Sequence, residues 1–340
     1  MRKKAIKNVT VALMLTFLAI YFFCVKNVAL ATRLNRGVCN YVRATLLKIT
    51  GIFNFSIFEI ILFLLPVILF LLIFYICKAK SREEVKSRFT LALFLLFISL
   101  LPYAFCIGIS KGAEELSEMI IDTKRNRDEH EVSDVANYLS EVLSDIESAE
   151  TLTLSEIDRE VTKTYKRIEK KYSLPMGAAL KSKPFARVSL FSKLGILGLY
   201  SPTGEVNINE NIPKYMLPFN VAHEYAHTLG AGSEADANFL AYIICTESEK
   251  PFLRYSGALC ILEYFMAEDK KIYTNVYKKL KNEAKDDLLE WKIYASRNQT
   301  KIGTALDKAN DVYLNSTDKY GKGSYSETVR YVTAYHNCIK

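Results

Sequence analysis

The sequence predicts a mainly α-helical protein with a small β-sheet: an α+β soluble domain that follows an N-terminal region of three transmembrane helices. Three observations support this prediction. Three apolar runs lie within residues 1–110, apolar residues recur at helical spacing through most of the remaining chain, and one short stretch alternates polar and apolar residues as a strand does. The 340 residues suffice for about two domains.

Charge divides the chain where hydropathy does. The formal net charge is +8, but residues 1–110 carry +11 (14 Lys and Arg against 3 Asp and Glu), whereas residues 111–340 carry −3. Basic residues that flank apolar segments indicate membrane topology rather than a surface for nucleic acid. Charged residues make up 24% of the chain, which disfavours a channel or transporter embedded in the membrane throughout.

The three apolar runs have the length of membrane spans. They cover residues 9–25, 57–77 and 89–109, and a helix needs about 20 residues, in a range of about 17–25, to cross the hydrocarbon core. Pro66 and Pro102 lie inside the second and third runs. Membrane helices tolerate proline, so both runs still qualify as spans.

The first run has an alternative interpretation as a cleaved signal peptide. A basic segment precedes it, and Ala29-Leu30-Ala31 could serve as the cleavage site. The run is long for a signal peptide, however, and Lys26 and Asn27 separate it from these small residues. These two features favour a span that stays in the protein.

The basic residues also predict the orientation of the spans, because loops rich in Lys and Arg stay in the cytoplasm. The N-terminal segment and the loop 78–88 together carry nine such residues, against five in the segment 26–56. We therefore expect a multi-pass protein of the cell membrane. Its N-terminus would lie inside and its soluble domain, after residue 110, would be extracytoplasmic.

A charged helical connector, residues 111–150, is predicted to follow the spans. Ser133 is its expected N-cap, and an apolar stripe at helical spacing follows that residue: Val135, Leu139, Val142 and Ile146. Residues 151–340 are predicted to form the second domain, whose first helix begins at a capping box of Ser155 and Asp158. These stripes are typical of packing surfaces.

Three strands are expected next. β-Branched and aromatic residues predict strands over 186–191 and 195–200, and a turn is predicted at 201–204. Alternation in 205–209 then predicts a half-buried strand. An extended peptide substrate could pair with residues 206–209 by β-augmentation.

The motif His-Glu-x-x-His follows at residues 223–227. His223 and His227 are four residues apart, so a helix places both imidazoles on one face, where they can bind one metal ion. Glu224 would lie beside the metal as the general base that takes a proton from a zinc-activated water. Gly230 is placed to end the helix. The alternative is a helix with two surface histidines.

A catalytic zinc ion needs a third protein ligand. Ser233 is the predicted N-cap of a second helix, and Glu234 and Asp236 in its first turn are both candidates. Asp236 already has a role, because an acid at that position completes a capping box. Glu234 is therefore the predicted third ligand. An oxyanion could be stabilised by Arg254, Tyr255, Tyr325 or His336, although each of these four residues has a simpler structural interpretation.

The cysteines do not indicate a disulfide framework. The seven cysteines include no CxxC motif. We expect buried free thiols, with one disulfide among Cys245, Cys260 and Cys338 as the alternative.

The sequence resembles the bacterial domain-of-unknown-function family 3810, membrane proteins with an N-terminal multi-span region and a zinc-peptidase-like domain. The resemblance rests on residues 55–57, 200–205, 217–219, 222–227, 234–239, 252–257, 311–314 and 323–325. Residues 234–239 also look like the third-ligand helix of gluzincin-type zinc peptidases, which supports Glu234 over Asp236. The resemblance implies a zincin-like metallopeptidase domain with a zinc cofactor, and it implies no substrate.

Two functions are compatible with these features. The first is a membrane-anchored zinc metalloendopeptidase that hydrolyses a peptide or protein substrate, with Glu224 as general base and His223, His227 and Glu234 as metal ligands. Its partners would be that substrate and the lipid bilayer, and no nucleic acid. The second is a non-hydrolytic, zinc-containing scaffold or receptor in envelope assembly. A transport function is disfavoured because the spans contain a single acidic residue, Glu59.

Overall fold

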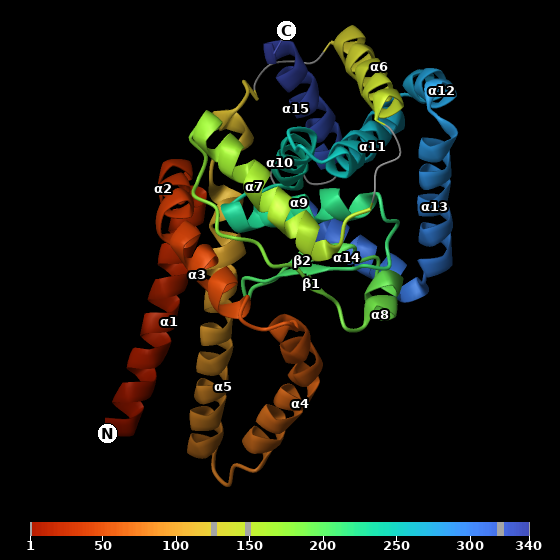
Figure 1. The fold of residues 1–340 in the computed structure, drawn as a ribbon. Helices are drawn as coiled ribbons and strands as arrows, with labels where there is room; N and C mark the ends of the chain where they lie inside the picture. Colours follow the sequence, from red (N-terminus) through yellow and green to blue (C-terminus); the bar gives the residue numbers. More distant parts are fainter. Residues whose placement is uncertain (1, 124–127, 147–150, 318–322, 340) are drawn as a thin grey trace.

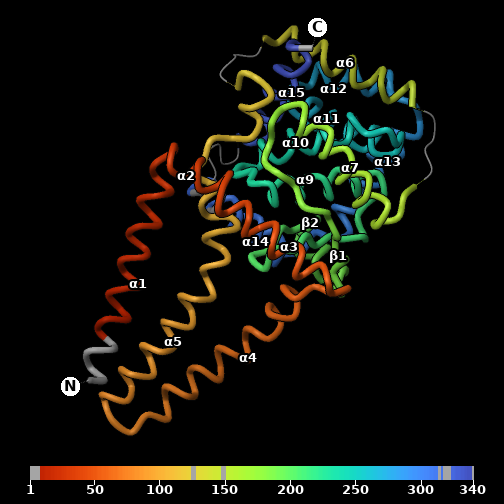
Figure 2. The backbone as a smooth tube through the Cα atoms, turned by 60° about the vertical axis from the view of Figure 1, so that its left-hand side comes forward, coloured from red at the N-terminus to blue at the C-terminus, as the bar shows by residue number. Residues whose placement is uncertain are grey.

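The computed structural model describes residues 2–123, 128–146, 151–317 and 323–339, and it is mainly helical with one small sheet (Figure 1). Three helices in this part of the chain are long and apolar enough to cross a membrane: α1 (Arg2–Lys26), α4 (Ile57–Cys77) and α5 (Arg82–Tyr103). Short π-helical and 3-10 turns continue α5 to Gly112. All three extend from one end of the remaining domain (Figure 2). The predicted runs therefore coincide with helices of the expected length.

The segment between the first two apolar helices is folded onto the domain. It contains α2 (Val28–Leu34), a π-helical turn (Asn35–Cys39) and α3 (Asn40–Thr50). Arg43 of α3, one of the five basic residues of this segment, is fully buried. A buried guanidinium cannot lie at a membrane surface, so four of the five basic residues of this segment remain to be counted for the orientation of the spans.

The core of the domain is built around one buried helix, α10 (Glu234–Thr246). It packs against α7 (Leu154–Tyr172), α9 (Met216–Leu229), α11 (Pro251–Glu268) and α15 (Ser324–Ile339). Every residue of α10 from Ala235 to Cys245 is buried. A helix that is buried on all sides is typical of the centre of a fold.

The remaining helices surround this core (Figure 1). They are α6 (Glu129–Asp145), α8 (Val188–Lys193), α12 (Lys270–Lys279), α13 (Asn282–Asn298) and α14 (Lys301–Thr317). Helix α6 packs against α11, α12 and α15, so this part of the predicted connector lies on the domain. All seven cysteines are free, as predicted, but only four of them are buried. Cys77 and Cys338 are exposed, so the prediction of buried thiols is wrong for these two.

Two helix starts differ from the prediction. Helix α6 is capped by Asp128 rather than Ser133. Helix α7 begins with a capping box of Thr153 and Glu156, two residues before the predicted one. The true box has the same spacing, and the predicted acid, Asp158, is buried and accepts a hydrogen bond from the Ser182 amide at 2.8 Å.

The sheet has three short strands in the order β1-β3-β2. The central strand β3 (Val206–Ile208) is parallel to β1 (Lys183–Pro184) and antiparallel to β2 (Gly198–Tyr200). All three residues of β3 are fully buried, so the prediction of a half-buried strand is wrong. Because β3 has a partner on each side, a peptide cannot pair with it, and the predicted β-augmentation at this strand is excluded.

The predicted strand 186–191 is wrong, since residues 188–193 form the helix α8. A short run of β-branched and aromatic residues fits a single helical turn as well as a strand. Here tertiary contacts determine the outcome. The Glu59 carboxylate accepts hydrogen bonds from the Ala186 and Arg187 amides just before α8, and Phe191 stacks on Phe185 with centroids 3.7 Å apart.

Candidate metal centre

Helices α9 and α10 bring two imidazoles and one carboxylate together. The Nε2 atoms of His223 and His227 lie 3.3 Å apart. The Glu234 carboxylate lies 3.2 Å from Nε2 of His223 and 3.8 Å from Nε2 of His227. Ligands on a tetrahedral zinc ion, with bonds of about 2.0–2.2 Å, lie roughly 3.3–3.6 Å from each other. The three side chains therefore fit the ligand set of a zinc ion.

Helix geometry positions the two histidines. Four residues of an α-helix make about one turn, which brings the rings of His223 and His227 within 4.9 Å of each other, centroid to centroid. Helix α9 ends at Gly230, whose φ of +104° favours glycine. The chain reverses there and enters α10 at its N-cap Ser233, so Glu234 returns to the two imidazoles.

The outer ring nitrogen of each histidine has its own acceptor. Nδ1 of His227 lies 3.0 Å from the Ala231 carbonyl oxygen, and Nδ1 of His223 lies 2.8 Å from Oδ1 of Asn238. A carbonyl oxygen only accepts hydrogen bonds, so Nδ1 carries the proton in each ring. Nε2 is thereby the nitrogen of each ring that faces the cluster, the orientation that metal binding requires.

The charges of the three groups are strongly coupled. Burial disfavours protonation of His223, but the Glu234 and Glu224 carboxylates outweigh it and raise the pKa of His223 to about 9. Burial lowers the pKa of His227 to about 4. Burial would raise the pKa of Glu234, yet the two imidazoles hold it well below its usual value. One positive charge, on His223, thus faces one carboxylate where a cation would fit.

Glu224 lies on α9 against the strand β2. Its side chain is buried, and its carboxylate accepts a hydrogen bond from the Tyr200 amide at 2.6 Å. Gly198 allows this approach, because a Cβ there would lie 2.7 Å from Oε1 of Glu224. Burial raises the pKa of Glu224 to about 7, a shift that His223 opposes. A carboxylate with this pKa can gain and lose a proton near neutral pH.

The second candidate ligand, Asp236, faces away from the histidines. Its carboxylate accepts hydrogen bonds from the Leu116 amide at 3.0 Å and the Ser117 amide at 2.8 Å. Burial, with the neighbouring Glu115, raises the pKa of Asp236 to about 7. Of the two acids, only Glu234 lies with the imidazoles. Asp236 joins the chain after α5 to α10 instead of completing a capping box.

Three of the four candidate oxyanion groups have structural partners. Arg254 donates to the carbonyl oxygens of Ser248 and Glu249, Tyr255 donates to Asp287 at 2.6 Å, and His336 lies 2.6 Å from the Tyr242 hydroxyl. The Arg254 contacts hold the segment between α10 and α11, the Tyr255 contact joins α11 to α13, and the His336 contact joins α15 to α10.

Tyr325, the fourth candidate, has a different environment. It is exposed and packs on Tyr264, and it interacts electrostatically with Glu234. Tyr325 therefore remains a candidate, through its electrostatic interaction with a predicted metal ligand.

Three residues that contact the site lie outside the His-Glu-x-x-His motif and were not predicted. Asn238 could have been found, because it lies one helical turn after Glu234 on α10. Asn35 and Arg43 could not, since they lie about 190 residues before the motif. The Asn35 amide donates to the Gly230 carbonyl at 2.9 Å, and Arg43 donates to the Thr228 carbonyl at 3.0 Å. Both side chains donate hydrogen bonds to carbonyl groups at the C-terminal end of α9, which have no partner within the helix.

Comparisons with known proteins give a family and no activity. Comparisons with curated proteins and with solved structures find no match. The family model described as "Protein of unknown function (DUF3810)" matches residues 34–333, which include α3, α4, α5 and all three candidate metal ligands. This match covers most of the chain. The chain therefore belongs to the DUF3810 family.

Proposed function

We propose that this protein is a membrane-anchored zinc metallopeptidase of zincin-like type. The observation that carries the proposal is the convergence of His223, His227 and Glu234 at zinc-ligand distances, with the Glu224 carboxylate on the same helix. When bound, a zinc ion would supply Lewis acidity that lowers the pKa of water and polarises a peptide carbonyl. Helices α1, α4 and α5 would anchor the chain in the cell membrane, with the catalytic domain outside.

The residues of the site have separate roles in this proposal. Glu224 takes a proton from water at a carboxylate oxygen and later gives it to the leaving amine. The Tyr200 amide holds that carboxylate in place. Asn238 and the Ala231 carbonyl hold the two rings in the required tautomer. Tyr325 is the remaining candidate to donate a hydrogen bond to the oxyanion.

An extended peptide would bind along the edge of β2 that faces away from β3, where the Tyr200 amide holds Glu224. The Ser201 amide donates to Glu205, and the Leu197 carbonyl accepts from the Asn209 amide, so residues at these alternate positions face β3. Gly198 and Tyr200 therefore direct their backbone groups to the opposite edge, where Glu224 lies. A peptide added to this edge would pass the carboxylate.

The test compares Glu224→Gln with wild type in the full-length protein. We expect the variant to keep its zinc and its thermal stability while turnover of a randomised mixture of quenched fluorescent peptides falls by about 10²–10⁴-fold, the usual contribution of a general base. Glu141→Gln, at an exposed position of α6, is the matched control with unchanged turnover. Equal turnover in Glu224→Gln and wild type would refute the peptidase. The zinc-containing scaffold would then account for a protein whose function depends on His223 and not on Glu224.

A further inference from the structure

Helix α14 places its polar side against the domain. The Thr300 hydroxyl, just before the helix, donates to the Lys193 carbonyl at 2.8 Å. A Cβ at Gly303 would lie 2.6 Å from that same oxygen, and the Asp307 carboxylate lies against Gly195. Among the first ten residues of α14, all of them described, only Gly303 is buried. The inner face of α14 is thus small and polar.

The outer face of α14 is apolar. At about 100° per residue, five residues fall within an arc of roughly 120° on the side away from these contacts: Ile302, Ala305, Leu306, Ala309 and Val312. Ile302 is 67% exposed, Leu306 43% and Val312 70%. A helix on a soluble domain normally has the reverse arrangement, with its apolar side against the core. This inversion indicates that an apolar phase covers the outer face.

A chain of contacts through α8 connects α14 to the start of α4. Glu59, in the first turn of α4, binds the Ala186 and Arg187 amides that lead into α8. Helix α8 has six residues, about 9 Å in length. Its Lys193 carbonyl is the group that binds Thr300 at the start of α14. Figure 1 and Figure 2 show α14 beside β1 and β2, at the end of the domain from which the apolar helices extend.

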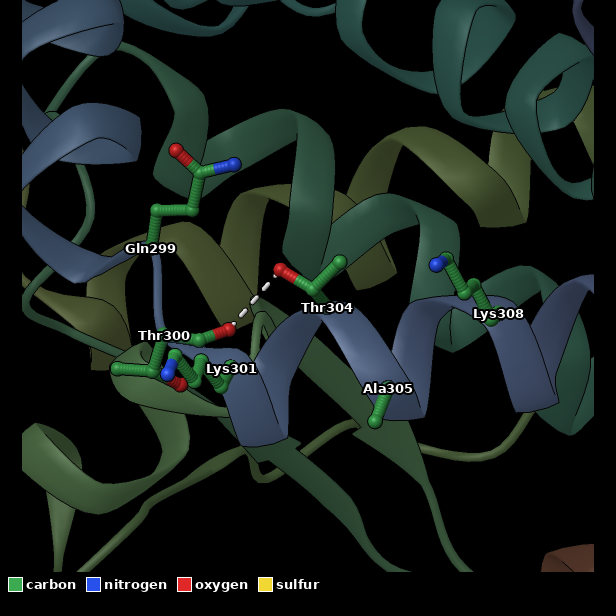
Figure 3. A pocket seen from close by; sticks show the side chains of 6 residues that line it. All are labelled: Gln299, Thr300, Lys301, Thr304, Ala305 and Lys308. Carbon is green, nitrogen blue, oxygen red and sulfur yellow. Dashed lines mark hydrogen bonds between the residues drawn. The ribbon is translucent and has the colours of Figure 1, made fainter.

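Two lysines border the apolar face. Lys301 and Lys308 lie along one side of α14 and, together with Thr300, Thr304 and Gln299, line a shallow hollow of about 460 Å³ (Figure 3). Lysines that flank an apolar stripe are typical of helices at a membrane surface, where the ammonium groups reach lipid phosphates while the stems stay in apolar surroundings.

We propose that α14 lies on the outer surface of the membrane in which the protein is anchored. Its apolar face inserts at the boundary between head groups and acyl chains, and Lys301 and Lys308 pair with anionic head groups. This inference rests on the proposed membrane anchoring and is independent of the proposed catalysis. It fixes the base of the domain to the bilayer, in addition to the three spans.

The experiment places a single tryptophan at chosen positions of the full-length protein. Trp291, the one tryptophan of the chain, is replaced in Trp291→Phe. Leu306→Trp is then added to probe α14, Leu64→Trp to probe the middle of α4, and Glu141→Trp to probe α6 at the far end of the domain. Each variant is reconstituted into phosphatidylcholine and phosphatidylglycerol vesicles with and without phosphatidylcholine brominated near the top of its acyl chains.

A helix buried about 5–10 Å into the interface predicts roughly a twofold loss of Leu306→Trp fluorescence with brominated lipid, a blue-shifted emission and no loss in Glu141→Trp. Leu64→Trp reports on the anchoring itself. If Leu64→Trp is quenched and Leu306→Trp is not, the inference about α14 is wrong while the anchoring stands. Blue-shifted emission of Leu306→Trp without quenching also overturns it, because a second copy or another protein then covers the face. Ile302→Trp repeats the test if Leu306→Trp fails to fold.

Discussion

Asn238, which is not one of the candidate metal ligands, holds the ring of one of them. Its Oδ1 atom is the acceptor for Nδ1 of His223, and its own amide lies 3.4 Å from the Thr328 hydroxyl on α15. The orientation of the first histidine therefore depends on a neighbouring helix. Such contacts behind a ligand determine its tautomer and its affinity for metal.

Replacing this acceptor should weaken zinc binding. We expect Asn238→Ala to lower zinc affinity by about 10–100-fold in a chelator competition titration, because His223 loses the partner that orients its ring. Asn238→Asp, which keeps an acceptor, should restore most of the affinity. Asn220→Ala, in which an asparagine of α9 loses only a bond to the Met216 carbonyl, is the matched control. Equal affinities in Asn238→Ala and Asn220→Ala would show that the contact has no role.

At the residue scale, the sequence predicted the features that depend only on the spacing of residues along one helix. The spacing of His223, Glu224 and His227 determines their relative positions on a helix, and the structure brings both rings together as expected. The choice between Glu234 and Asp236 is not local, since Asp236 is held by amides about 120 residues earlier in the chain. The roles of Arg43 and Asn35 depend on the same kind of distant packing.

At the scale of elements, the contact between β2 and α9 determines where Glu224 can lie. Gly198→Ala would place a methyl group 2.7 Å from Oε1 of the Glu224 carboxylate, so that side chain must move. We expect peptide turnover to fall by about 10²-fold, the effect of a misplacement of about 1 Å, with zinc content unchanged. Gly323→Ala, where a Cβ meets no atom within 4 Å, should have no effect. Turnover by Gly198→Ala equal to that of wild type would show that hydrolysis does not depend on the position of Glu224.

Helix α7 also contains a buried acid that makes stability depend on pH. Burial raises the pKa of Asp158 to about 6 from 3.8, although its bond to Ser182 opposes the shift. The folded state therefore binds this proton more tightly than the unfolded state does. Its contribution favours folding in acid and is lost as pH rises from about 4 to about 6. The resulting cost at pH 7 is of the order of 2–3 kcal/mol.

Asp158→Asn should remove this cost, because the amide oxygen still accepts the Ser182 bond and no charge is buried. We expect the variant to be about 1–2 kcal/mol more stable than wild type at pH 7. The difference should shrink or reverse at pH 4, as measured by chemical unfolding at both pH values. A difference that does not change with pH would mean that Asp158 is not buried as a charged group.

The elements themselves were predicted unevenly. The apolar helices and the helices of the domain followed from runs and periodicity that extend over many residues. The strands were predicted in part. Strands β2 and β3 lie within the predicted segments 195–200 and 205–209, whereas β1 has two residues and pairs with β3 more than 20 residues later in the chain, so no local pattern predicts it. Residues 188–193 became a helix since Glu59 of α4 binds the amides that precede them, a contact that no local pattern contains.

At the scale of the whole molecule, two carboxylates join the domain to α4. Glu205, next to β3, accepts hydrogen bonds from the amides of Ile57 and Phe58 at the start of α4. Glu59 of α4 binds amides of the domain in return. Glu205 is also paired with Lys183, and both of these side chains are buried. This junction fixes the direction of α4 relative to the sheet.

Neutralising Glu205 should destabilise the junction strongly. In Glu205→Gln the buried Lys183 ammonium loses its partner, which costs about 3–5 kcal/mol. The double variant Lys183→Met, Glu205→Gln should recover much of that loss, and Glu83→Gln, at an exposed position, should show none. Thermal unfolding in detergent measures all three. A Glu205→Gln protein as stable as wild type would contradict the assigned role of the pair.

The most direct test of the central claim is zinc analysis of the purified protein beside its His223→Ala variant. The full-length chain is needed, because Asn35 and Arg43 bind the end of the helix that carries the histidines. We predict one zinc ion per wild-type chain after reconstitution and a loss of that ion in the variant. A wild-type protein that binds no stoichiometric metal, or a variant that binds as much as wild type, would contradict the metal centre.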